Sequence, residues 1–145
     1  MSVDVERFST VPLFEGLQAS EISELLKIAE DVSVADGEEV VRQGEPGTGF
    51  FVIGAGKFEV LKSGKKSEVL ARLEDLSYFG EMSLVNDEHR TASVICVEAG
   101  RLKKFPKDKF QGLLDSGSLT AYRVIHNMCR ILAQRLARAD EHRVS

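Results

Sequence analysis

Cysteine, proline and tryptophan are all scarce in this chain. Its 145 residues contain two cysteines, three prolines and no tryptophan. Cys96 and Cys129 each lie in an apolar run, and neither has the spacing of a disulfide framework or a metal site. We therefore expect both to be small buried hydrophobic side chains of a protein in the reducing cytoplasm.

Long apolar runs and excess positive charge are also missing. No run of about 18 apolar residues is present, which argues against a membrane span, and the first residues lack the basic and apolar regions of a signal peptide. The net charge is −4, so general affinity for nucleic acid, which needs a basic surface, is not expected. The length fits a single domain covering residues 1–145.

Residue types used in catalysis are present but lack partners. His89, His126 and His142 have no metal-ligand spacing, and no general base is identifiable for Ser83 or Ser93. We therefore expect no enzymatic activity, no metal and no cofactor.

The pattern of apolar residues changes twice along the chain. Residues 1–31 form a predicted helical segment that includes a helix capped by Ser20. Residues 32–105 carry short apolar runs separated by glycines, which is typical of an antiparallel sandwich or barrel. The runs are 32–34, 40–41, 50–53, 58–61, 69–73, 92–97 and 102–105. Turns are predicted at 44–47 and, as a hairpin tip, at 62–66.

Residues 106–145 are predicted to form two C-terminal helices. Pro106 opens a short helix that ends near Gly117, and a long helix starts near Ser118. The apolar residues at heptad spacing on the long helix are Tyr122, Ile125, Cys129, Leu132, Leu136 and Ala139. The residues that widen this stripe are Ala121, Val124, Met128 and Ile131. Two interpretations stay open: the helix lies on its own barrel, or it also pairs with a second copy.

Residues 79–94 carry the clearest binding chemistry. Glu81 and Arg90 lie nine residues apart, on either side of a short apolar run. The guanidinium of Arg90 suits two phosphate oxygens, and a helical turn at 82–85 would point backbone N–H groups at the same anion. Glu81 is repelled by phosphate but accepts hydrogen bonds from a sugar hydroxyl. Together these groups predict a site for a small anionic nucleotide.

The same segment resembles the phosphate-binding cassette of cyclic nucleotide-binding domains. Such domains occur in bacterial catabolite-activator-type regulators, in regulatory subunits of cyclic-nucleotide-dependent kinases and in cyclic-nucleotide-gated channels. Segments 11–17, 37–47 and 50–56 resemble other parts of the family, so the resemblance covers essentially residues 10–140. It implies a mainly β fold: an eight-stranded, jelly-roll-like antiparallel β-roll with N-terminal helices and a long C-terminal helix.

The resemblance also implies a ligand and its contacts. Glu81 would hold the ribose 2′-hydroxyl and Arg90 the cyclic phosphate. The expected ligand is cyclic AMP, with cyclic GMP as the alternative, because Thr91 is compatible with both. The implied ligand-binding residues are the cassette residues Gly80, Glu81, Met82, Ser83, Arg90 and Thr91, the wall residues Val60 and Leu70, and the lid residues Ile131 and Arg135 of the long helix.

The four residues before Arg90 depart from the family pattern. Residues 86–89 replace a segment that often carries glycine and proline, and Asp87 and Glu88 add negative charge near an anion site. Either these carboxylates point to solvent and are screened, or they weaken phosphate binding. A degenerate β-roll that acts as a protein-interaction module is therefore an alternative to a cyclic nucleotide receptor, as is a receptor for a cyclic dinucleotide.

The chain stops at Ser145, about where the long helix should end. In the bacterial regulators this helix leads into a DNA-binding domain, so DNA binding is not expected from this chain alone. We expect a stand-alone sensor module or a fragment of a larger protein. Its C-terminal helix would signal to a protein partner or a second copy through residues 118–143.

Overall fold

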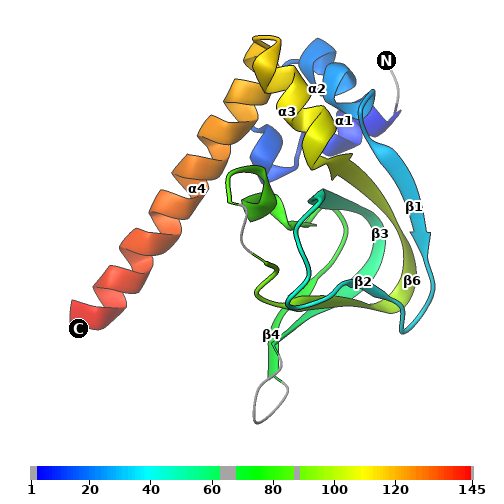
Figure 1. The fold of residues 1–145 in the computed structure, drawn as a ribbon, viewed down its shortest axis with the longest axis vertical. Coiled ribbons are helices and arrows are strands. Elements are labelled where there is room, and N and C mark those ends of the chain that lie inside the picture. The colour runs from blue at the N-terminus through cyan, green and yellow to red at the C-terminus, as the bar shows by residue number, and fades with distance from the viewer. Residues whose placement is uncertain (1–2, 63–67, 87–88, 145) are drawn as a thin grey trace. The chain divides into compact units, whose positions relative to one another are not determined.

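The computed structural model describes residues 3–62, 68–86 and 89–144, whose elements divide between two compact units. One unit contains residues up to 26 and from 113 onward, and the other contains residues 27–112. The helical elements are α1 (Val3–Phe8), η1 (Pro12–Phe14), α2 (Ala19–Leu26), η2 (Glu81–Leu84), α3 (Lys107–Asp115) and α4 (Leu119–Val144). The strands are β1 (Glu30–Val34), β2 (Glu39–Val41), β3 (Gly49–Lys62), β4 (Glu68–Leu73), β5 (Tyr78–Phe79) and β6 (Ser93–Pro106), as Figure 1 shows.

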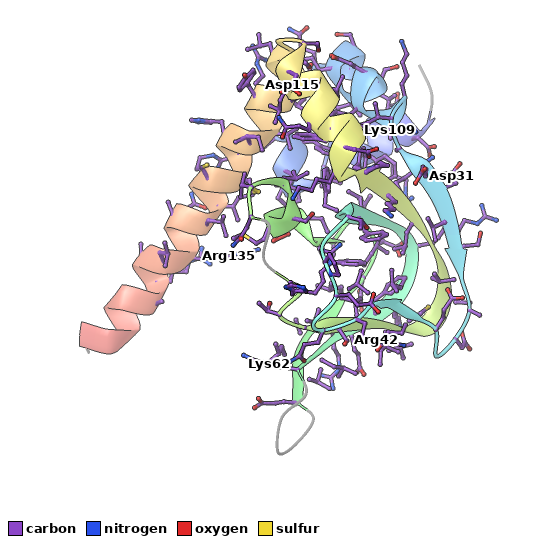
Figure 2. The ribbon with its side chains drawn as sticks, viewed as in Figure 1. Asp31, Arg42, Lys62, Lys109, Asp115 and Arg135 are labelled. Carbon is purple, nitrogen blue, oxygen red and sulfur yellow. The ribbon has the colours of Figure 1, made fainter. Side chains whose placement is uncertain are left out.

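The strands form one antiparallel sheet that curls into a roll (Figure 1). The strand order is β1-β6-β3-β4, with β2 also paired to β6 and β5 to β3. Across the β1/β6 edge, Lys103 forms an ion pair with Asp31, which Figure 2 labels on β1. The predicted mainly β fold with flanking helices and a long C-terminal helix is confirmed.

The described residues contain six strands where the resemblance implied eight, because β3 and β6 each join two predicted runs. Runs 50–53 and 58–61 both lie in β3, and runs 92–97 and 102–105 both lie in β6. The register of β3 on β6 shifts between Ile53 and Lys57. At this bend a Cβ on Gly56 would lie 2.8 Å from the Cα of Gly100. The glycines therefore mark bends in continuous strands rather than strand ends.

Aromatic side chains fill both sides of β3. Phe51 points into the core cluster and stacks on Phe79, with 4.9 Å between ring centroids. Its neighbour Phe50 points to the opposite face, where it stacks on Phe105 at 4.6 Å and meets the edge of Phe110. The core cluster consists of Val34, Phe51, Ile53, Phe58, Phe79, Val94, Cys96 and Leu102. The predicted burial of Cys96 is confirmed.

The helical unit is built around α4. The predicted start of this helix is confirmed, because Ser118 Oγ accepts a hydrogen bond from the backbone N–H of Ala121 at 3.2 Å. The start of α2 differs from the prediction. That helix begins at Ala19, so Ser20 lies inside it, and the carboxylate of Glu21 instead accepts a hydrogen bond from Gln18 N at 3.1 Å.

The buried apolar face of α4 is not the stripe of residues at heptad spacing. Ala121, Val124 and Met128 are buried, whereas Tyr122 and Leu136 are 54% and 66% exposed. Cys129 is also exposed, so the prediction that it is buried is wrong. Both stripes have helical periodicity, and only packing within the folded unit decides which one is covered.

Two further predictions have structural outcomes. A turn is present two residues before the predicted 44–47, because Glu45 N donates to Arg42 O at 3.1 Å and closes residues 42–45. The predicted hairpin tip at 62–66 lies, beyond Lys62, outside the described residues. Within those residues, no helix is long and apolar enough to span a membrane.

Candidate functional site

A glycine in left-handed conformation connects β5 to the turn η2. Gly80 has φ 82° and precedes Glu81, the first residue of η2. A Cβ at Gly80 would lie 2.5 Å from Arg90 Nη1 and 3.1 Å from Gly49 O. Both the backbone conformation and the lack of space therefore require glycine here. The predicted helical turn is confirmed, with the bounds Glu81–Leu84.

The guanidinium of Arg90 is held by two backbone carbonyls. Its Nη2 donates to Gly49 O at 2.9 Å and its Nη1 lies 3.3 Å from Gly80 O. The backbone of Arg90 is fixed as well, because its N–H donates to Glu45 O at 2.7 Å and its carbonyl accepts from Gly44 N at 2.8 Å. The turn at 42–45 thus holds the backbone of Arg90, while β3 and the β5–η2 connection orient its side chain.

The electrostatic setting of Arg90 favours an added anion. Burial lowers the pKa of Arg90, while the nearby charge of Glu81 acts in the opposite direction. The structure therefore brings the two residues of the predicted cassette together, with both side chains half-buried. A guanidinium has five N–H donors, and the two carbonyls take two of them. The guanidinium therefore keeps N–H donors for a third acceptor.

Ser83 faces the protein rather than outward. Its hydroxyl lies 2.9 Å from Gly49 O and 2.8 Å from Gly80 O, and the residue is only 5% exposed. Gly49 and its carbonyl were missed by the sequence analysis, as was Gly47, where a Cβ would lie 2.6 Å from Ser83 Cβ. The signal that could have revealed them is the glycine spacing in 44–49, of which 44–47 was predicted as a turn without a role in the site.

The predicted wall residues have different surroundings. Val60 packs against the core cluster and pairs with Ala71. Leu61 pairs with Val69, so Leu70 is the extra residue of a bulge in β4, and it is 51% exposed.

The remaining predicted site residues are less constrained. In the cassette, Met82 is 43% exposed and Thr91 is exposed next to Arg90. Ile131 and Arg135 belong to the helical unit, where Figure 2 labels Arg135 on α4, and their role as a lid stays a prediction. Asp87 and Glu88 lie outside the described residues. Within the described part of the chain, no group of three or more acidic, His or Cys residues could hold a metal ion.

Comparison with known proteins identifies relatives of this arrangement. Residues 31–117 match the family model described as "Cyclic nucleotide-binding domain". A cAMP-dependent protein kinase regulatory subunit of Mucor circinelloides f. lusitanicus is 41% identical over 97 residues, covering 66% of this chain and 22% of the relative. A cGMP-dependent protein kinase of Toxoplasma gondii is 39% identical over 88 residues, covering 61% of this chain and 9% of the kinase.

A solved structure shows the same fold. The Catabolite Activator Protein of Thermus thermophilus matches with a TM-score of 0.81 at 28% identity, covering 90% of this chain and 61% of that one. The chain spans less than two thirds of the length of each of these three proteins.

Proposed function

The chain belongs to the cyclic nucleotide-binding domain family, and from this premise we propose that residues 80–91 bind the ribose and phosphate of a cyclic nucleotide. The observation that carries the proposal is the half-buried Arg90, oriented by two neutral carbonyls beside Glu81. Its burial removes hydration without a full counter-charge, so a cyclic phosphate would gain charge-assisted hydrogen bonds there. Glu81 would accept a hydrogen bond from the ribose 2′-hydroxyl, because a carboxylate is acceptor-only.

Cyclic AMP is the proposed ligand and cyclic GMP the alternative. Support for cyclic AMP comes from relatives named as cAMP-dependent kinase regulatory subunits. A relative is named as a cGMP-dependent kinase, which supports cyclic GMP as the alternative. Thr91 is exposed, and its hydroxyl is compatible with either base. A cyclic dinucleotide is less well supported, since it has two phosphates and the cassette has one arginine.

Further contacts follow from the same proposal. Gly80 would let the ligand approach the backbone, and the N–H group of Met82 would face the phosphate. The N–H of Ser83 donates instead to Gly80 O at 3.2 Å. Val60 and Leu70 would contact the base from the roll, and Ile131 and Arg135 would close over it from α4.

The signal would be a change in the position of α4 rather than a reaction. A ligand shifts a two-state equilibrium only by its difference in affinity for the two states, so a lid that touches the base couples binding to helix position. The exposed Tyr122 and Leu136 support a protein partner or a second copy along residues 118–143. A cytoplasmic location is part of the proposal, as expected for a receptor with free cysteines.

Titration calorimetry with cyclic AMP, cyclic GMP and a cyclic dinucleotide tests the proposal. We expect saturable heat with cyclic AMP, and weaker binding of the other two. Absence of heat with all three ligands at micromolar protein and millimolar ligand would exclude the receptor function.

A protein-interaction module is the second candidate, favoured by the exposed apolar residues of α4. Thermal melts separate the two candidates. A ligand that binds only the native state raises the melting temperature. At a ligand concentration of a hundred times Kd, the free energy of unfolding rises by about 2.7 kcal/mol. A melting temperature that does not change when nucleotide is added would favour the interaction module.

A further inference from the structure

Two donors share the same two carbonyl oxygens at the base of the cassette. Gly49 O lies 2.9 Å from both Arg90 Nη2 and Ser83 Oγ. Gly80 O lies 3.3 Å from Arg90 Nη1 and 2.8 Å from Ser83 Oγ, and it also accepts from the backbone N–H of Ser83 at 3.2 Å. The hydroxyl and the guanidinium are therefore linked through a pair of backbone groups that come from separate segments of the chain.

Ser83 is closely packed. The residue is 5% exposed, and its Cβ lies where a side chain on Gly47 would have to go. A hydroxyl has a single hydrogen to donate. That hydrogen is shared between the two carbonyl oxygens, so none is left to donate to an external ligand. The hydroxyl links the start of β3 to the β5–η2 connection, next to the pairing of Phe51 with Phe79 between β3 and β5.

We propose that Ser83 is a positioning residue, whose hydroxyl holds the carbonyls of Gly49 and Gly80 at the spacing that orients the Arg90 fork toward a phosphate. This inference rests on the proposed function, because the anion it serves is the cyclic phosphate. It assigns the Ser83 side chain a role distinct from that of its backbone N–H. Binding depends on it because a bidentate contact requires a fixed guanidinium plane.

The substitution Ser83→Ala tests this role with little change in volume. We expect cyclic AMP affinity to fall roughly tenfold, equivalent to about 1.4 kcal/mol. Arginine side-chain NMR provides a readout that does not depend on ligand. Hindered rotation in the native protein should give separate Nη signals for Arg90, identified by their loss in Arg90→Lys, and these signals should average in Ser83→Ala.

Ser93→Ala is the matched control. Ser93 is also a buried serine of the strand unit, at 7% exposure, and its hydroxyl accepts from Gln43 N at 2.8 Å instead of bridging the two glycine carbonyls. Gln43 adjoins Gly44 and Glu45, which hold the Arg90 backbone, so this variant removes a hydrogen bond near the arginine without touching the two glycine carbonyls. We expect its Arg90 signals to stay separate and its affinity to fall less than in Ser83→Ala. Ser83→Cys, which keeps a weak S–H donor, should be intermediate, and it replaces the alanine variant if that variant does not fold.

Unchanged Arg90 signals in Ser83→Ala would overturn the positioning role, as would unchanged affinity or an equal loss in Ser93→Ala. These outcomes are distinct from failure of the proposed function. If the native protein binds none of the three ligands, the receptor proposal fails, and with it the phosphate-directed role of Ser83. Separate Nη signals would then still show that the Arg90 side chain is held by the two carbonyls.

Discussion

In each unit one side chain donates hydrogen bonds to two backbone carbonyls, and the two side chains differ in how many N–H donors they have left. In the helical unit, Asn127 Nδ2 donates to Leu13 O and Glu15 O, each at 2.9 Å. In the strand unit, Arg90 donates to Gly49 O and Gly80 O. The amide nitrogen of asparagine has two N–H groups and both are used, whereas the guanidinium has five.

The difference separates a structural contact from a binding site. Asn127 is neutral and 7% exposed, and its oxygen accepts from Arg130 Nη2 at 3.4 Å, so its hydrogen-bonding capacity is nearly used up. Arg90 is charged and only half-buried, and its first partners carry no charge. A polar group with unused donors at a partly open position is suited to a ligand, and a saturated buried one is suited to holding segments together.

Removing Arg90 should have the largest effect on binding. We expect Arg90→Ala to weaken cyclic AMP binding by at least about 1.5–3 kcal/mol, because a hydrogen bond to a charged group is lost. Arg90→Lys should recover only part of this, since an ammonium keeps the charge but not the planar fork. Calorimetric titration measures both variants.

Arg42→Ala is the control for this loss of charge. Arg42 follows β2, carries an exposed side chain and pairs with Glu39 at 2.6 Å, which raises the pKa of its guanidinium (Figure 2). Because carboxylates already pair with the Arg42 guanidinium at the surface, we expect Arg42→Ala to bind cyclic AMP with the affinity of the native protein. Equal affinity in Arg90→Ala and the native protein would remove Arg90 from the site.

Removing Asn127 should act on stability instead. Asn127→Ala leaves the carbonyls of Leu13 and Glu15 without their donor, and we expect the free energy of unfolding to fall by about 1–3 kcal/mol. The midpoint of urea unfolding at constant slope measures this loss. His126→Ala, on the exposed neighbour, should stay within about 0.5 kcal/mol. An Asn127 variant as stable as the native protein would mean that the helical unit does not depend on this contact.

The order of elements was predictable because hydrophobic periodicity is a local signal. Helix, strands and helix appear where the sequence places them, and Glu81 and Arg90 come together as the cassette spacing implied. The number of strands was not predictable in the same way. Gly56 and Gly100 are turn signals in the sequence, yet in the fold they let two continuous strands bend past each other.

The parts of the site that escaped prediction depend on long-range pairing. The carbonyl of Gly49 precedes Arg90 by 41 residues and Ser83 by 34, and it has no side chain to mark it. Its direction is set by the pairing of Gly49 with Pro106 at the start of β3. Similarly, the sequence of α4 offers two apolar stripes, and only packing against η1 and α2 buries the one that contains Val124.

The smallest expected effect on binding comes from Gly80, where substitution can separate the role of the backbone conformation from that of the contact with Arg90. Gly80 and Gly37 share φ 82°, but a Cβ at Gly80 would meet Arg90 Nη1 at 2.5 Å whereas one at Gly37 has nothing within 4 Å. Gly37→Ala should therefore lose only about 1–2 kcal/mol of stability, the cost of a left-handed alanine, with native affinity. Gly80→Ala should lose that stability and also weaken cyclic AMP binding about fivefold or more, because the fork must shift. Equal affinities in the two variants would show that Gly80 serves the turn alone and that the orientation of Arg90 tolerates displacement.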